Sequence, residues 1–264
     1  MNFTVDGRQG FAYTAAHALD AAKPSVVFLH GAGFDHSMFG LQSRYFGYHG
    51  RNVLAVDFPA HGRSAGPPLA SVPEMADWVM RLLDAAKVER ASLVGHSLGS
   101  LVALDCAARY PMRVERIALL GIAYPMTVSD AFLQAAKENR QDAYDMDTIW
   151  GHAPQVPLGA NPNPGMWMYG DALARLGRLG PGVLYSGLLA CHTYAGGDAA
   201  AAKVTCPVLL MLARRDQMTP MRAGVEFAKH LPQAKIVQLS ASGHSVMTEE
   251  PDAVLDALID FFRG

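Results

Sequence analysis

The stretch LVGHSLGS, residues 93–100, follows an apolar run and places Ser97 between Gly95 and Gly99. Glycine weakens both strands and helices, so two glycines around one serine need a steric reason. A sharp turn from a strand into a helix supplies it, because the residues two before and two after the serine approach each other too closely for side chains. We therefore predict that this turn exposes the Ser97 hydroxyl as a nucleophile.

Short apolar runs rich in β-branched residues predict strands that are buried on both faces. These runs span residues 25–31, 52–58, 91–97, 116–122 and 207–213, and a further predicted strand at 234–240 follows them. Helical patterns at 74–86, 98–109 and 251–262 alternate with them, which is typical of βαβ units and a mostly parallel sheet with helices on both faces. Residues 1–5 and 11–15 predict a hairpin joined at Asp6-Gly7, so the expected sheet has eight strands.

The alternation of strands and helices stops near residue 122 and resumes near residue 205. Helical stretches at about 129–147, 171–178 and 183–193 lie between these points, around a proline-containing stretch at 155–170. We interpret residues 123–202 as a helical cap inserted after the sixth strand. Residues 1–122 and 203–264 then form the α/β core domain.

Composition limits the classes of function. The chain has 264 residues, half of them hydrophobic, which is enough for one large domain with an inserted subdomain. A net charge of −2 without a basic stretch disfavours a nucleic-acid partner. The sequence has no run of about 18 apolar residues, so we expect no membrane-spanning helix. The N-terminus lacks the pattern of a signal peptide, and Cys106, Cys191 and Cys206 lack the spacing of a disulfide framework or zinc site. We expect a cytoplasmic protein without metal or organic cofactor, and the oligomeric state stays open.

A serine hydroxyl is a weak nucleophile unless a base takes its proton and a carboxylate orients that base. Asp216 follows the predicted strand 207–213 in RRDQMTP, and His244 follows the strand 234–240 in ASGHSVMTEEP. Parallel sheets build their active sites at the C-terminal ends of their strands, where all three residues are expected. The sequence therefore predicts a catalytic triad of Ser97, His244 and Asp216.

Several motifs, in this order, resemble those of the α/β-hydrolase superfamily over nearly the whole chain: HGAGFDHSMF (30–39), DFPAHGRS (57–64), GHSLG (95–99), RRDQMTP (214–220) and GHSVMTEEP (243–251). The resemblance implies a capped serine hydrolase whose oxyanion hole is formed by the backbone N–H groups of Ala32 and Leu98. A serine nucleophile separates the chain from the haloalkane dehalogenases and epoxide hydrolases of this superfamily, which use an aspartate there. Ala213 stands where the family often has glycine, so the turn to Asp216 is expected to differ slightly.

Candidate substrate-binding residues are Gly33, His96, Trp150, Trp167 and Met168. Methionine and aromatic side chains can line a substrate pocket or pack in the interior of a cap. Both roles therefore stay open for Trp150, Trp167 and Met168. His96 adjoins Ser97, but neighbouring side chains in such a turn point apart, which favours a structural role. Residues 122–202 hold two of the three tryptophans and five of the nine tyrosines, with four basic and seven acidic residues. This composition favours a small or medium, apolar or aromatic, uncharged substrate.

The expected activity is hydrolysis of an ester or another activated acyl bond of a small molecule through an acyl-enzyme. Lactones, thioesters and meta-cleavage diketones, whose hydrolysis breaks a carbon–carbon bond, remain alternatives, as does perhydrolysis, because this fold hosts many reactions. A different class of function is a ligand receptor or regulatory protein of the same fold with slow turnover. The HGAGFDHSMF loop resembles the corresponding loop of such proteins as well as that of esterases.

Overall fold

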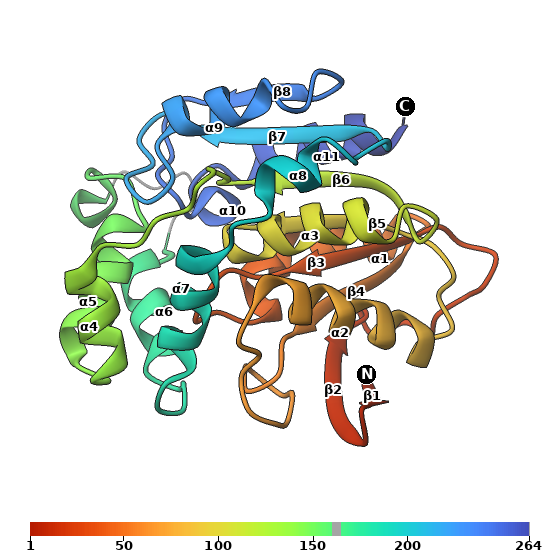
Figure 1. Cartoon of the computed structure of the whole chain (residues 1–264), viewed down its shortest axis with the longest axis horizontal. Helices are drawn as coiled ribbons and strands as arrows, with labels where there is room; N and C mark the ends of the chain where they lie inside the picture. The colour runs from red at the N-terminus through yellow and green to blue at the C-terminus, as the bar shows by residue number, and fades with distance from the viewer. Residues whose placement is uncertain (160–164, 264) are drawn as a thin grey trace.

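The computed structural model describes residues 1–159 and 165–263, which form one eight-stranded sheet with helices on both faces (Figure 1). The strands are β1 (Asn2–Val5), β2 (Arg8–Tyr13), β3 (Ser25–Leu29), β4 (Asn52–Asp57), β5 (Ala91–His96), β6 (Val114–Leu120), β7 (Val208–Ala213) and β8 (Lys235–Leu239). Their order in the sheet is β1-β2-β4-β3-β5-β6-β7-β8. β1 and β2 pair antiparallel, and β3 to β8 run parallel. The fold class predicted from the sequence is confirmed.

Helices connect the parallel strands and cover the sheet. They are α1 (Gly40–Tyr48), α2 (Val72–Ala85), α3 (Leu98–Arg109), α4 (Asp130–Lys137), α5 (Gln141–Trp150), α6 (Met168–Leu176), α7 (Val183–Thr193), α8 (Gly197–Ala201), α9 (Met221–Ala228), α10 (Val246–Glu249) and α11 (Pro251–Arg263), with short 3-10 turns η1 (His36–Phe39) and η2 (Val156–Leu158). The predicted helical stretch 129–147 is divided into α4 and α5 at Asn139, whose φ of 54° interrupts the helix. α1 and α9 lie outside the helical patterns that the sequence predicts.

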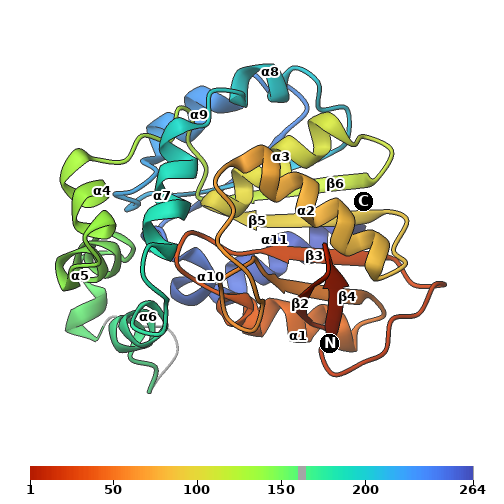
Figure 2. The same cartoon turned by 60° about the horizontal axis from the view of Figure 1, so that its bottom comes forward.

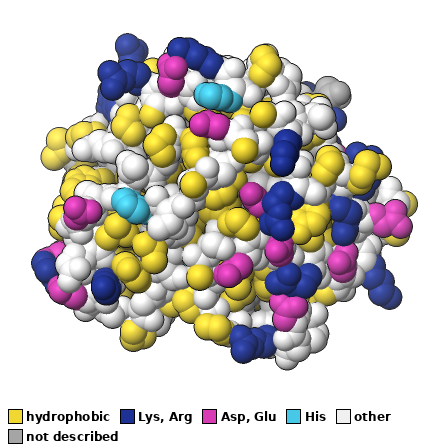
Figure 3. Space-filling model, in the orientation of Figure 1, with side chains coloured by type: hydrophobic (Ala, Val, Ile, Leu, Met, Phe, Trp, Pro, Cys, Tyr) yellow, Lys and Arg dark blue, Asp and Glu magenta, His cyan; other side chains and the backbone are white. Residues whose placement is uncertain are grey.

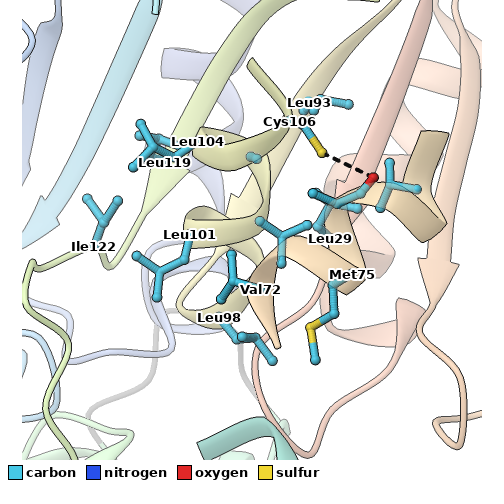
Figure 4. Packing of buried hydrophobic residues seen from close by; sticks show 14 of the residues in the cluster. Leu29, Val72, Met75, Leu93, Leu98, Leu101, Leu104, Cys106, Leu119 and Ile122 are labelled. Atoms are coloured by element: carbon cyan, nitrogen blue, oxygen red, sulfur yellow. Dashed lines mark hydrogen bonds between the residues drawn. The ribbon is translucent and has the colours of Figure 1, made fainter. Parts of the chain in front are cut away.

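Two hydrophobic clusters lie on opposite faces of the sheet. Alternation along β3 shows the division, because Val27 and Leu29 belong to one cluster while Val26 and Phe28 belong to the other. The first cluster includes α2, α3, α8 and α9, and the second includes α1, α10 and α11. Figure 4 shows the first cluster around α3, where the Cys106 thiol contacts the carbonyl oxygen of Ala76 at 3.8 Å. The first cluster therefore holds α3, and with it the turn at the N-terminus of α3, against one face of the sheet.

Between β6 and β7 the chain forms α4 to α8, and Figures 1 and 2 both show α4 to α7 gathered at one end of the sheet. This agrees with the predicted insertion of helices after the sixth strand. The division into a core domain and a cap with boundaries at 123 and 202 stays a prediction. Residues 160–164 of the proline-containing stretch lie outside the described residues.

The face of the molecule in Figure 3 shows basic and acidic side chains interspersed with apolar ones. Ion pairs such as Arg81–Asp6 and Arg113–Asp84 join charges of opposite sign across surface elements. Within the described residues, every helix is too short or too polar to cross a lipid bilayer.

Candidate active site

Ser97 lies in the turn between β5 and α3 with φ 53° and ψ −116°, a backbone conformation that residues other than glycine rarely adopt. Hydrogen bonds hold the turn. The Ser97 N–H donates to the Leu120 carbonyl at 2.9 Å, and the Ser97 carbonyl accepts from the Ser100 hydroxyl at 2.6 Å. The turn therefore fixes the backbone of Ser97 and leaves its side chain partly exposed.

The two glycines around Ser97 are required by close backbone contacts. A Cβ atom on Gly95 would lie 2.1 Å from the carbonyl oxygen of Gly99, and one on Gly99 would lie 2.1 Å from the carbonyl oxygen of Leu29. Both obstacles are backbone atoms, so no change of rotamer could relieve them. This is the steric reason that the spacing in residues 93–100 predicts.

We expect Gly99→Ala to lower the free energy of unfolding by about 4 kcal/mol or more, because α3 would have to move away from β3. Urea denaturation of both proteins measures the loss. Gly40→Ala is the matched control, since Gly40 is helical and a Cβ there would meet nothing within 4 Å. A similar stability of the two variants would contradict the steric argument.

Asp216 and His244 form a hydrogen-bonded pair. His244 Nδ1 lies 2.8 Å from Asp216 Oδ2, and Thr219 Oγ1 donates to the same oxygen at 2.7 Å. Asp216 Oδ1 accepts from the backbone N–H groups of Met218 at 2.8 Å and Thr219 at 2.7 Å. These donors fix the carboxylate so that His244 Nδ1 carries a proton and donates a hydrogen bond to Asp216. In the neutral imidazole, Nε2 is then an acceptor.

The pKa values of the pair are set by burial and by each other. Burial would raise the pKa of Asp216, but His244 and the donors from Thr219 outweigh it and lower that pKa. Burial would likewise lower the pKa of His244, but Asp216, with contributions from Asp147 and Glu249, raises it above the ordinary value. Asp216 is therefore ionised at neutral pH and increases the basicity of the imidazole.

A cavity of about 320 Å³ lies over the pair, and both Ser97 and His244 line it. Among the described residues, none forms a hydrogen bond with the buried Nε2 atom of His244. Ser97 and His244, whose Nε2 is an acceptor without a partner among the described residues, therefore line the same cavity. This arrangement suits transfer of the hydroxyl proton to His244 when a substrate is bound.

The predicted oxyanion-hole residues lie at the same place. Ala32 follows β3 and lines the cavity together with Gly31. A Cβ on Gly31 would lie 3.4 Å from the Cβ of Ser97, so this loop passes directly beside the serine. Leu98 is the first residue of α3, so its N–H has no carbonyl partner within the helix. The structure thus places Ala32 in the wall of the cavity that Ser97 lines and Leu98 directly after Ser97, while their role as oxyanion donors stays a prediction.

His96 is buried, and its Nε2 lies 2.9 Å from the carbonyl oxygen of His244. Burial, with a smaller contribution from His244, lowers the pKa of His96 to about 3, so it is neutral and Nε2 donates. His96 lines the cavity, but it also positions the backbone of His244. The geometry agrees with the structural role that the sequence favours.

Three of the predicted substrate-binding residues do not line the cavity. Gly33 has a φ of +73°, and a Cβ there would lie 2.9 Å from the side chains of Leu176 and Leu184, so packing under α6 and α7 accounts for it. Trp167 is 75% exposed, and Met168 packs in a separate small cluster. Of the two tryptophans in this segment, only Trp150 lines the cavity, and the structure places Gly33, Trp167 and Met168 outside its wall.

Sequence reasoning missed several residues at the site. Thr219 supports Asp216, and its position three residues after an aspartate is the signal that could have indicated it. Glu249 accepts from the N–H groups of Ala153 at 2.9 Å and Gly243 at 3.1 Å, and no local pattern indicates this long-range contact. Asp147 on α5 faces the cavity, where the sequence predicts only apolar and aromatic groups from the helical segment.

A further contact joins the helical segment to the loop that carries His244. The N–H of Ser245 donates to the carbonyl of Gly151 at 2.8 Å. Together with the two hydrogen bonds to Glu249, it fixes residues 151–153 against the loop 243–245. The end of α5 therefore helps to position His244.

Comparison with known proteins agrees with this fold. The sequence pattern of the alpha/beta hydrolase family matches residues 26–257. The chain is 29% identical to a pimeloyl-[acyl-carrier protein] methyl ester esterase of Chromobacterium violaceum over 88% of this chain and 91% of that protein. Among solved structures, it is similar to the enol-lactonase of Burkholderia xenovorans LB400 (TM-score 0.86, 21% identity, 100% of both chains) and to an esterase of Exiguobacterium antarcticum (TM-score 0.86, 18% identity, 100% of this chain and 99% of that one). The family match covers most of the sequence, so the chain belongs to the alpha/beta hydrolase family.

Proposed function

We propose that this protein is a serine hydrolase that cleaves an ester or a related activated acyl bond of a small, largely apolar substrate. The observation that carries the proposal is the arrangement of His244. Its Nδ1 is bound to Asp216, while its Nε2 has no partner among the described residues and lines the same cavity as Ser97. A general base with one nitrogen fixed and the other free is what activation of a serine hydroxyl needs.

In the proposed reaction, Ser97 Oγ attacks the carbonyl carbon of the substrate while His244 Nε2 takes the hydroxyl proton. Asp216 stabilises the imidazolium that forms, and the N–H groups of Ala32 and Leu98 donate to the oxyanion. His244 then protonates the leaving group, which departs and leaves an acyl group on Ser97. Water, deprotonated by His244, attacks this acyl-enzyme, and the acid is released with Ser97 restored.

The shape of the cavity supports a small substrate. Its volume of about 320 Å³ is at the lower end for small-molecule sites, and apolar side chains such as Phe132, Trp150 and Leu188 form much of its wall. The esterase and enol-lactonase to which the chain is similar favour a carboxylic ester or a lactone as the bond that is cleaved. A thioester or an activated carbon–carbon bond would use the same groups of the site.

Multiple turnover of aryl esters tests the proposal. Purified protein should release many equivalents of p-nitrophenol from p-nitrophenyl acetate or butyrate. An aryl phosphonate should stop the reaction at one equivalent and should be found on the peptide that contains Ser97 by mass spectrometry. A burst of one equivalent followed by a stall would instead support the slow-turnover receptor, and labelling of another residue would contradict the mechanism.

A further inference from the structure

Asp147 places a carboxyl group in the wall of the cavity that contains Ser97 and His244. It lies on α5 and is 4% exposed. No described residue donates a hydrogen bond to its side chain, and the interaction that acts on it is the longer-range attraction of His244. The carboxyl group therefore faces a largely apolar cavity without a donor from the protein.

Asp147 differs in this respect from the other buried carboxylates of the described chain. Asp57, Asp105, Asp216 and Glu249 are also buried, and each accepts at least two hydrogen bonds from backbone or side-chain donors. A buried carboxylate without donors is costly, because burial disfavours the ion. Burial raises the pKa of Asp147 to about 7, and the attraction of His244 opposes this only in part. Among the described buried carboxyl groups, Asp147 alone is buried without hydrogen-bond donors, and it lies at the cavity.

We propose that Asp147 accepts a hydrogen bond from an N–H or O–H group of the acyl substrate and thereby selects substrates that carry such a donor. The inference rests on the proposed function and refines its substrate class: an acyl compound with an apolar body and one hydroxyl, amine or amide N–H group within reach of α5. A site built around a polar group discriminates strongly against analogues that leave this group unpaired.

Phe132 and Trp150 strengthen this assignment. They pack edge to face with ring centroids 5.7 Å apart and line the cavity beside Asp147. These apolar rings share the cavity wall with a carboxyl group that is itself buried, and a hydrogen bond from the substrate is stronger in such surroundings than at an open surface. An aromatic wall beside a carboxylate also accommodates an ammonium group.

Esters matched in shape test the inference. The pairs are p-nitrophenyl 3-hydroxybutanoate and 3-methylbutanoate, 2-hydroxyethyl and propyl acetate, and 2-(dimethylamino)ethyl and 3-methylbutyl acetate. Each kcat/KM is divided by the hydroxide-catalysed rate of the same ester. The wild type should prefer the donor-bearing member of at least one pair by about tenfold or more, as expected for a hydrogen bond to a carboxylate. The pair that responds tells whether the donor is a hydroxyl or an ammonium group and on which side of the acyl bond it lies.

Variants of Asp147 complete the test. Asp147→Leu should bring the preferred ratio close to one, and it removes an unpaired polar group, so the protein should stay folded. Asp147→Asn keeps the size and an acceptor, and should lose preference for an ammonium group while keeping part of that for a hydroxyl. Asp145→Leu is the matched control, because Asp145 is exposed on the same helix, and it should keep the wild-type ratio.

Two results would overturn the inference. One is a wild-type ratio near one in all pairs. The other is an unchanged ratio in Asp147→Leu with both rates lowered alike, which would mean that Asp147 acts only through His244. If the wild type hydrolyses none of the esters, the proposed function fails, and calorimetric binding of the same pairs to Ser97→Ala and to Ser97→Ala/Asp147→Leu decides the inference. The inference is supported if Ser97→Ala binds the donor-bearing ester more tightly than its partner and Ser97→Ala/Asp147→Leu does not. Equal binding of both esters by Ser97→Ala would overturn the inference.

Discussion

Replacing Ser97 with alanine should lower kcat for p-nitrophenyl butyrate by about 10⁶-fold, the loss measured when the nucleophile of a triad is removed. The reason is chemical and not structural. Alanine should keep the turn, since the hydrogen bonds at position 97 use the backbone N–H and carbonyl, which the substitution keeps. The remaining rate would come from the oxyanion donors and the cavity alone.

Steady-state kinetics of p-nitrophenol release would measure this effect, with thermal unfolding as the test of folding. Ser100→Ala is the matched control three residues along α3. It removes the hydrogen bond from the Ser100 hydroxyl to the Ser97 carbonyl, a loss of about 1 kcal/mol in stability, and should change kcat little. Activity of Ser97→Ala within tenfold of the wild type would exclude Ser97 as the nucleophile.

Asp216→Asn should lower kcat by about 10⁴-fold, because an amide cannot keep His244 in the required tautomer. The amide nitrogen donates and would favour an unprotonated Nδ1, which puts the proton on Nε2 and blocks the base. The loss of the carboxylate also removes the charge that stabilises the imidazolium. Measurement of kcat across pH 5–9 should show the loss at every pH at which the wild type is active.

Asp57→Asn provides the comparison for Asp216, since Asp57 is also buried and is the last residue of another strand of the sheet, β4. Its oxygens accept from the backbone N–H groups of His36 at 2.7 Å and Arg63 at 2.8 Å, so it stabilises the loops on either side. We expect the substitution to lower the unfolding temperature and to leave kcat of the folded protein much less affected. If Asp57→Asn abolishes turnover in folded protein and Asp216→Asn does not, the assignment of the acid is wrong.

The sequence predicts the sheet well because β3, β4, β5 and β7 are buried along their whole length and appear as continuous apolar runs, while the edge strand β8 is largely exposed. It also indicates which residues meet at the candidate site. Ser97 follows β5 directly, and Asp216 and His244 lie in the loops after β7 and β8. The C-terminal ends of parallel strands lie at one edge of the sheet whatever the details of packing. The glycines at 95 and 99 mark the close approach of β5, α3 and β3, which the structure confirms.

The helical segment is less predictable, because composition does not determine which face of a helix meets the cavity. Trp150 and Trp167 look alike in sequence, but only Trp150 packs against Phe132 in the wall, while Trp167 is largely exposed. Asp147 is hidden for the same reason, since an acidic residue on a helix is usually solvated. Glu249 contacts Ala153 across 96 positions, and only the packed chain brings them together.

The attachment of residues 151–153 to the loop that carries His244 limits how this enzyme can be recombined. A chimera that receives the helices of a relative would have to supply a carbonyl for the Ser245 N–H and an N–H for Glu249, or the base would lose its backbone support. Laboratory evolution of substrate range is therefore better directed at α4 and α7. These helices contribute Phe132 and Leu188 to the cavity wall and take no part in those hydrogen bonds.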